Sequence, residues 1–121
     1  MEIVKKEFKH GVFVLELAGP LQIGVECKQL ELALNQLLHD GQTRVVLDLA
    51  GLTKLDSAGL GKLVNCFSRV KTAGGALCLT GTTGMINGVL KLAHADRFLR
   101  TYATPREAAE SFSSSSQPPA I

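Results

Sequence analysis

Six residues near the middle of the chain, Arg44 to Leu49, limit its possible folds more than any other segment. Their sequence, Arg-Val-Val-Leu-Asp-Leu, is short, rich in β-branched residues and almost continuously apolar. Such a run is typical of a β-strand covered on both faces, because a strand with one wet face would alternate apolar and polar residues. We therefore expect this strand in the middle of a sheet, with helices packed against it.

The segments on either side of this strand alternate between strand and helix patterns. Apolar residues recur with a period of two or at helical spacing, and breaker pairs such as Gly19-Pro20 separate the segments. His10-Gly11 indicates a hairpin turn between the first two strands. The predicted strands are 3–9, 12–18, 44–49, 76–80 and 98–103, and the predicted helices are 27–38, 57–72, 85–93 and 105–112.

This order, β-β-α-β-α-β-α-β-α, predicts an α/β fold. The opening hairpin is antiparallel, whereas strands joined by helices run parallel through right-handed crossovers, so the sheet is mixed and covered by α-helices. The last helix has a strong start signal. Thr104 is its expected N-cap, Pro105 its first helical residue, and Glu107 completes a capping box.

Length and composition predict one domain with a short tail. The chain has 121 residues, of which 45% are hydrophobic, and a chain of that size buries roughly 60 to 70% of its unfolded surface on folding. We assign residues 1–112 to the domain. Residues 113–121 read Ser-Ser-Ser-Ser-Gln-Pro-Pro-Ala-Ile, a composition that predicts a disordered C-terminal tail.

Charge and cysteine usage argue against several partners and compartments. Thirteen Lys and Arg residues are mixed with eleven Asp and Glu residues for a net charge of +2, which does not indicate binding to nucleic acid or a membrane. Cys27, Cys66 and Cys78 lie in apolar stretches, so we expect core residues in a reducing compartment. The first residues do not resemble a secretory signal, and a cytoplasmic location is predicted.

The sequence lacks the motifs of common catalytic and cofactor sites. Residues 59–61 supply only two of the three glycines of a dinucleotide fingerprint, and no Walker A motif occurs. His10, His39 and His94 stand apart, without other metal ligands at suitable spacing, and we interpret them as surface residues. Ser57 is not in a nucleophile elbow. We therefore predict no cofactor, no metal and no enzyme activity.

The junction between strand 44–49 and the next helix is the most informative segment for function. A short loop follows the strand, and Asp56-Ser57 opens a helix with Gly59 and Gly61 in its first turns. Taken alone, Ser57 is a helix N-cap worth about 1 kcal/mol, and the two glycines allow helix and sheet to approach closely.

This junction resembles the STAS domain family, the fold of bacterial anti-sigma-factor antagonists. The family's hallmark is a strand ending in Leu-Asp-Leu, a short loop and then Asp-Ser-small-Gly-Leu-Gly, which Asp48 and residues 56–61 match. Nearly the whole chain is similar to the family, because Gly19-Pro20-Leu21, Gly74-Gly75 and residues 92–102 match its other landmarks. The resemblance implies a STAS-like mixed sheet.

The resemblance also implies a partner and a switch. In such antagonists the serine that corresponds to Ser57 is phosphorylated by the anti-sigma factor, a serine kinase of the histidine-kinase-like ATPase type, which binds only the unphosphorylated form. A phosphate adds about −1.5 to −2 charge at a helix N-terminus whose amides can hold an anion, and that charge weakens docking. The expected partner-binding residues are Gln22, Lys54, Asp56, Ser57, Ala58, Gly59 and Gly61.

Two positions depart from the family pattern. Gln22 replaces the acidic residue that antagonists commonly have after Gly-x-Leu, so a carboxylate is missing at the phosphorylation face. His94 stands where the family often has Gly, and we expect it at a helix C-terminus with a positive φ. Lys54 and Lys62 flank Ser57 and are more simply explained as solvated residues than as guides for an acidic partner.

The sequence leaves three functions open. The first is a cytoplasmic antagonist, a monomer or weak dimer, that binds an anti-sigma factor and regulates transcription by partner switching at Ser57. The second is a non-phosphorylated STAS adaptor or scaffold in a larger complex, stressosome-like or transporter-associated, whose binding is indifferent to residue 57. The third, motivated only by the glycines and the serine, is a small nucleotide-binding or hydrolytic protein.

Overall fold

The apolar segment that begins at Arg44 forms the central strand of a five-stranded sheet, as predicted. The computed structural model describes residues 1–114, and its strands are ordered β1-β2-β3-β4-β5. Val45, Val46 and Leu47 have no exposed surface. The elements are β1 (Glu2–Phe8), η1 (Lys9–Gly11), β2 (Val12–Leu21), α1 (Val25–His39), β3 (Arg44–Leu55), α2 (Ser57–Thr72), β4 (Ala76–Thr80), α3 (Gly84–Leu92), η2 (Ala95–Arg97), β5 (Arg100–Tyr102) and α4 (Pro105–Ser114).

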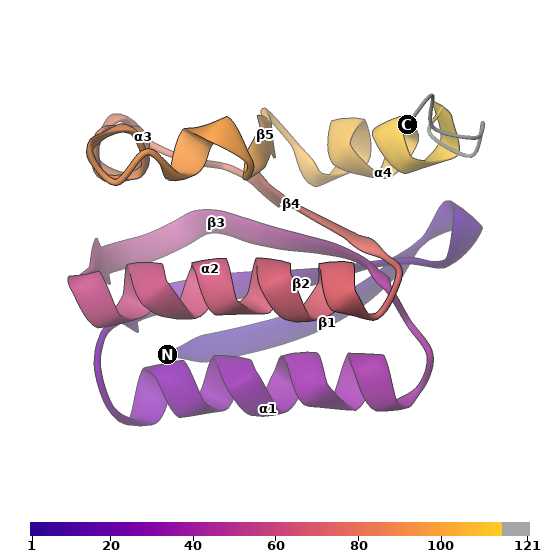
Figure 1. The fold of residues 1–121 in the computed structure, drawn as a ribbon, viewed down its shortest axis with the longest axis horizontal. Helices are drawn as coiled ribbons and strands as arrows, with labels where there is room; N and C mark the ends of the chain where they lie inside the picture. The colour runs from indigo at the N-terminus through magenta and orange to yellow at the C-terminus, as the bar shows by residue number, and fades with distance from the viewer. Residues whose placement is uncertain (115–121) are drawn as a thin grey trace.

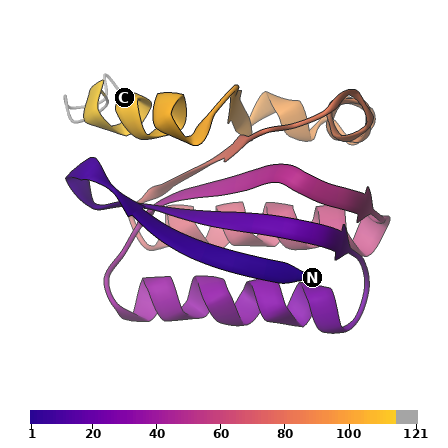
Figure 2. The same ribbon diagram turned by 180° about the vertical axis from the view of Figure 1, so that it is seen from behind.

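The mixed topology of the sheet is also confirmed. β1 and β2 pair antiparallel, and the remaining neighbours, from β2 to β5, pair parallel. The hairpin turn is the short 3-10 segment η1, in which His10 and Gly11 have φ values of 66° and 70°. These left-handed conformations let the chain reverse direction at the tip that Figure 2 shows from behind.

Helices cover both faces of the sheet, and each face has its own apolar core. The long helices α1 and α2 lie side by side on one face (Figure 1), where their buried residues pack against leucines of β2 and β3. On the opposite face α4 contributes Ala108, Ala109 and Phe112, which pack against Val14 and Val46. This two-sided cover explains why the sequence of β3 is almost continuously apolar.

Two strands extend further than the sequence predicted. β2 continues through Gly19-Pro20 to Leu21, and β3 continues through the predicted loop to Leu55. The two extensions pair with each other up to the partners Leu21 and Leu55, with register shifts on the way. Because this pairing joins residues far apart in the sequence, Gly19 and Pro20 do not end β2 as the local sequence predicts. They instead lie at an irregularity within the β2–β3 strand pair.

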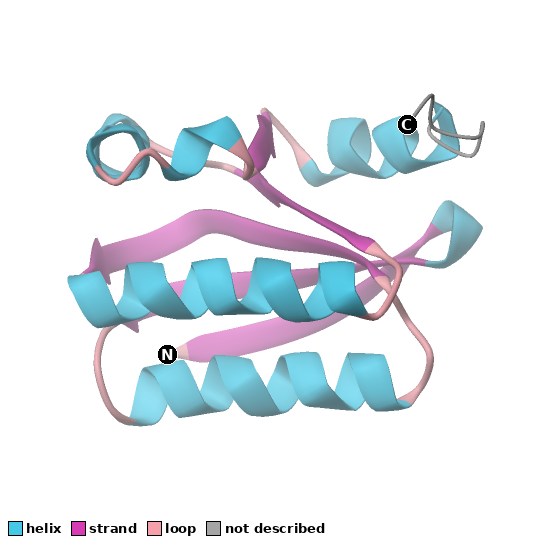
Figure 3. Cartoon of the chain, viewed as in Figure 1, coloured by secondary structure: helices cyan, strands magenta, loops and turns pink. Residues whose placement is uncertain are grey.

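The last part of the chain follows the prediction with changed boundaries. β5 has only three residues, because Phe98 and Leu99 donate their amides to Ala95 in the turn that follows η2. His94 has the expected positive φ, 59°. The short connections are drawn as loops in Figure 3.

The start of α4 agrees with the predicted cap. The hydroxyl of Thr104 accepts a hydrogen bond from the Glu107 amide at 3.2 Å. The helix extends to Ser114, two residues beyond the predicted end at Phe112. The rest of the predicted tail, 115–121, lies outside the described residues.

Removing the largest side chain that α4 buries tests its contribution to stability. We expect Phe112→Ala to lower the free energy of unfolding by about 3 kcal/mol or more, because it leaves a cavity between the helix and the sheet. Leu92→Ala is the matched control, since Leu92 is 85% exposed and its truncation should cost less than about 0.5 kcal/mol. Urea unfolding of the three proteins measures both values, and equal losses would contradict this account.

Candidate functional site

Helix α2 is capped by Asp56, not by Ser57. The backbone of Asp56 is extended, and its Oδ1 accepts a hydrogen bond from the Gly59 amide at 2.7 Å. Ser57 is therefore the first residue inside the helix, and the interpretation of Ser57 as the N-cap is wrong. Both residue types are good caps, so the local sequence could not decide between two neighbouring positions. Because Asp56 supplies the cap, the Ser57 hydroxyl is not needed to start the helix and is available for other chemistry.

The same carboxylate also holds the loop between β2 and α1. Oδ2 of Asp56 accepts a hydrogen bond from the Ile23 amide at 3.0 Å, and the Asp56 amide lies 3.4 Å from the Leu21 carbonyl oxygen. The bonds from Ile23 and Gly59, in that order of importance, lower the pKa of Asp56 below its ordinary value. Asp56 is therefore a fixed negative charge beside Ser57 at neutral pH.

Ser57 itself is exposed at the start of α2. Ala58 behind it is half-buried, and Gly59 is buried. The amides of a first helical turn have no partner within the helix and carry the positive end of its dipole. An anionic group on Ser57 would therefore meet favourable amides on one side and the charge of Asp56 on the other.

The two glycines of this turn have different surroundings. A Cβ on Gly59 would lie 2.2 Å from the backbone oxygen of Leu21 and 2.9 Å from Cδ1 of Leu55. A Cβ on Gly61 would meet no atom of the described residues within 4 Å. Close approach of helix and sheet thus accounts for Gly59, whereas packing does not account for Gly61.

The structure brings most of the predicted site residues to one edge of the sheet. Gln22 is half-buried and lies between Leu21 and Ile23, which both bond Asp56. Lys54 is exposed and pairs across from Pro20 near the ends of the two strands. Gly61 lies further along α2 and is exposed.

Lys62, the second flanking lysine, has a structural partner. Its Nζ lies 3.7 Å from Oε1 of Glu31 on α1, so it contributes to the contact between the two helices. This ion pair is partly exposed on both sides, and pairs of that kind contribute little to stability.

The sequence did not predict that Ile23 bonds Asp56 at this edge of the sheet. Its amide bonds a residue 33 positions away, and no local pattern reports such a contact. The available signal was two apolar residues, Ile23 and Val25, on either side of Gly24 and outside the apolar stripe of the following helix.

The cysteines and histidines show no reactive arrangement in the described part of the chain. All three cysteines are free and buried, as predicted, and burial raises the pKa of Cys66 and Cys78 to about 12, which keeps these thiols protonated. His10, His39 and His94 are exposed. Residues 1–114 contain no group of three or more side chains that could hold a metal ion.

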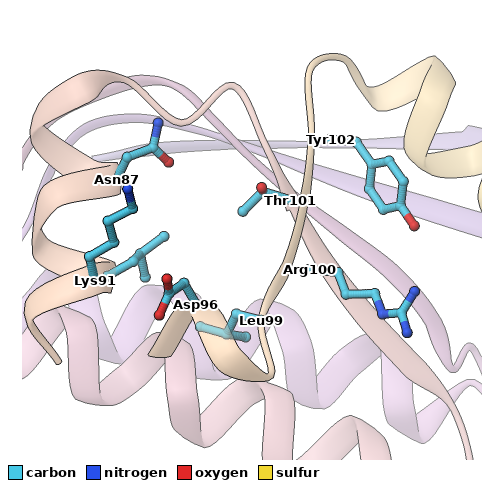
Figure 4. Close-up of a pocket in the computed structure, with 8 residues that line it drawn as sticks. Asn87, Lys91, Asp96, Leu99, Arg100, Thr101 and Tyr102 are labelled. Atoms are coloured by element: carbon cyan, nitrogen blue, oxygen red, sulfur yellow. The ribbon is translucent and has the colours of Figure 1, made fainter. Parts of the chain in front are cut away.

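A cavity of about 540 Å³ lies at β5, and none of the predicted site residues line it. Figure 4 shows Asn87, Lys91, Asp96 and Thr101 on one side of the strand, whereas Arg100 and Tyr102 extend from the other side. The polar groups therefore do not converge on one point. Among the described residues, no helix has the length and apolar character needed to span a bilayer.

The two glycines of α2 provide a matched pair of substitutions. Gly59→Ala should lower the free energy of unfolding by about 1–3 kcal/mol, because its methyl group collides with the strand backbone. Gly61→Ala should raise it by about 0.5–1 kcal/mol, because alanine is the better helix residue in open space. Urea unfolding measures the sign of each change, and two changes of the same sign would argue against this packing.

The pH dependence of stability tests the role of Asp56. The pKa of Asp56 is lower in the folded chain than the ordinary carboxyl pKa of 3.8 that it has in the unfolded chain. Its charge therefore stabilises the fold fully at pH values above 3.8. This contribution is lost as the pH falls through the folded pKa. We expect Asp56→Ala to unfold more readily than wild type at neutral pH and the difference to shrink in acid. Thermal unfolding between neutral and acid pH measures this, and a constant difference would contradict it.

Comparison with known proteins agrees with this geometry. The sequence pattern of the STAS domain matches residues 4–108. A Thermotoga maritima protein whose name assigns it provisionally as an anti-sigma factor antagonist is 30% identical over 76 residues, which are 63% of this chain and 67% of that protein. A crystal structure of a provisionally assigned antagonist from the same organism has a TM-score of 0.77 and 26% identity over 90% of this chain and 92% of that chain.

The fold also matches that of the Bacillus cell fate determinant SpoIIAA. Its phosphorylated form has a TM-score of 0.72 and 17% identity, covering 92% of this chain and 99% of that chain. Its unphosphorylated form, an anti-sigma factor antagonist, has the same TM-score and 15% identity, covering 93% and 98%. The family pattern spans most of the chain and the fold agrees with it, so the chain belongs to the STAS domain family.

Proposed function

We propose that this protein is an anti-sigma-factor antagonist that binds an anti-sigma factor while Ser57 is unmodified and is released when Ser57 is phosphorylated. The observation that carries the proposal is the position of Ser57, exposed as the first residue of α2 and adjacent to a cap supplied by a different residue. Ser57 can change its charge without removing the hydrogen bond that starts the helix.

The partner is proposed to be a serine kinase of the histidine-kinase-like ATPase type. The Ser57 hydroxyl oxygen forms a bond to the γ-phosphorus of ATP while the bond from that phosphorus to the bridging oxygen breaks. ADP leaves, and a base in the partner's active site takes the hydroxyl proton. An exposed serine allows this approach, and the open space around Gly61 leaves room for the nucleotide of the partner. The protein thus serves as substrate and binding partner and needs no catalytic group of its own.

Electrostatics make the phosphorylated form a poor binder. A phosphate carries about −1.5 to −2 charge at neutral pH, and it would stand beside the ionised carboxylate of Asp56. A docked partner would have to desolvate both groups together, which costs binding energy. Both the phosphorylated and the unphosphorylated form of SpoIIAA share the fold of this chain, which supports a switch that does not require refolding.

Residues 1–112 form the domain that we propose to act in this switch, as a monomer or weak dimer in the cytoplasm. Gln22 adds no charge beside Ser57, and it favours the adaptor alternative in which position 57 is unimportant. The nucleotide-binding alternative has less support, because packing accounts for Gly59. Calorimetry with ATP and GTP tests that alternative, and measurable binding to the isolated protein would favour it.

Bait proteins carrying different residues at position 57 test the proposed switch. Wild type, Ser57→Ala and Ser57→Asp are immobilised in a lysate of the source organism, and the retained proteins are identified by mass spectrometry. We expect wild type and Ser57→Ala to retain a kinase-like ATPase and Ser57→Asp to bind it at least about tenfold more weakly, because a charge next to Asp56 opposes docking.

Ser68→Asp is the matched control, because Ser68 is exposed on the same helix away from the cap. It should bind the partner like wild type. Equal retention of the same partner by all four baits would refute the switch and favour the adaptor function. The purified partner should also transfer phosphate from ATP to wild type but not to Ser57→Ala.

A further inference from the structure

Two large apolar side chains are exposed beside the capped end of α2. Ile23 is 76% exposed and Val25 is 69% exposed, and they stand on either side of Gly24 where β2 passes into α1. Single exposed apolar residues are common on protein surfaces. Two of them separated by one residue, at the edge that also holds Ser57, need an explanation in terms of binding.

The segment that carries this pair, from the loop after β2 to the first residue of α1, is fixed on both sides of Gly24. Gly24 has a φ of +107°, a conformation that other residues rarely adopt, and its carbonyl oxygen accepts the Lys28 amide at 3.2 Å in the first turn of α1. Before it, the Ile23 amide is bonded to Asp56. The pair is thus presented in a defined conformation, which lowers the entropy lost on binding.

The pair differs from other exposed apolar residues in its connection to Ser57. One carboxylate, that of Asp56, bonds both the Ile23 amide and the first turn of the helix that begins with Ser57. Leu32 on α1 and Leu92 at the end of α3 are 63% and 85% exposed. Among the described residues, neither leucine nor its chain neighbours form a hydrogen bond to Asp56 or to the first turn of α2.

We propose that Ile23 and Val25 form the apolar contact through which this chain binds its anti-sigma factor, and that Asp56 is the positioning residue that holds this contact beside Ser57. The proposal rests on the proposed function and names the residues that supply affinity there. The partner must then present an apolar depression next to its ATP site. Side chains that become fully desolvated in well-packed pockets near the centre of an interface supply much of the binding energy.

Truncation of the pair tests the contact. The probe is the purified kinase-type anti-sigma factor identified with the wild-type bait, and its affinity is measured by isothermal titration calorimetry. We expect the double variant Ile23→Ala, Val25→Ala to bind at least about tenfold more weakly than wild type. The matched control is the double variant Leu32→Ala, Leu92→Ala, which removes as much exposed apolar surface elsewhere and should change the affinity by less than about twofold.

A conservative change at Asp56 tests the positioning role. In Asp56→Asn a single side-chain oxygen remains, so the side chain cannot accept from both Ile23 and Gly59 in the present arrangement. We expect weaker binding by about threefold or more, together with faster hydrogen exchange of the Ile23 amide measured by NMR. A residue that merely stabilised the helix would change neither the Ile23 exchange rate nor the affinity at a temperature where both proteins are folded.

The outcomes separate this inference from the proposed function. If the alanine pair binds like wild type while Ser57→Asp does not bind, the apolar contact is refuted and the switch stands. If Ser57→Asp binds like wild type while the alanine pair binds weakly, the switch is refuted and the contact stands. An unchanged Ile23 amide and unchanged affinity in Asp56→Asn would overturn the positioning role.

Discussion

The site depends on one carboxylate that satisfies two backbone amides from distant parts of the chain. Asp56 accepts from Gly59, three residues later, and from Ile23, 33 residues earlier. The first bond starts α2, and the second fixes the loop that enters α1. Because Asp56 does both, Ser57 is left exposed on a turn whose geometry does not depend on its own hydroxyl.

The sheet brings these partners within reach of each other. β2 and β3 pair in parallel as far as Leu21 and Leu55, so the two chains leave the sheet at the same edge and at the same level. A Cβ on Gly59 would touch the Leu21 oxygen, which means that the start of α2 rests on the backbone of β2. Carboxyl ends of parallel strands are where such folds commonly place their functional residues.

Local sequence signals predicted what depends on local interactions, and they failed where distant segments decide. The buried strand at Arg44 and the cap at Thr104 follow from a few neighbouring residues, whereas the positive φ of His94 was expected from the resemblance to a family that often has Gly at that position. The ends of β2 and β3 depend on their mutual pairing, so Gly19-Pro20 did not end the strand. The cap was assigned one residue too late, and the hydrogen bond between the Ile23 amide and Asp56 joins residues 33 positions apart, which no local pattern predicts.

The lack of space around Gly59 limits how the sequences of related proteins can diverge in this region. A position that tolerates no side chain cannot encode a preference for one partner over another, and neither can a cap that must accept two amides. If Ile23 and Val25 bind the partner as proposed, differences in partner choice between related proteins fall on these residues and on Gln22, whose side chains no such constraint fixes. New partner pairs would then arise by exchanging a few residues between the end of β2 and the first turn of α1, with the cap and Gly59 unchanged.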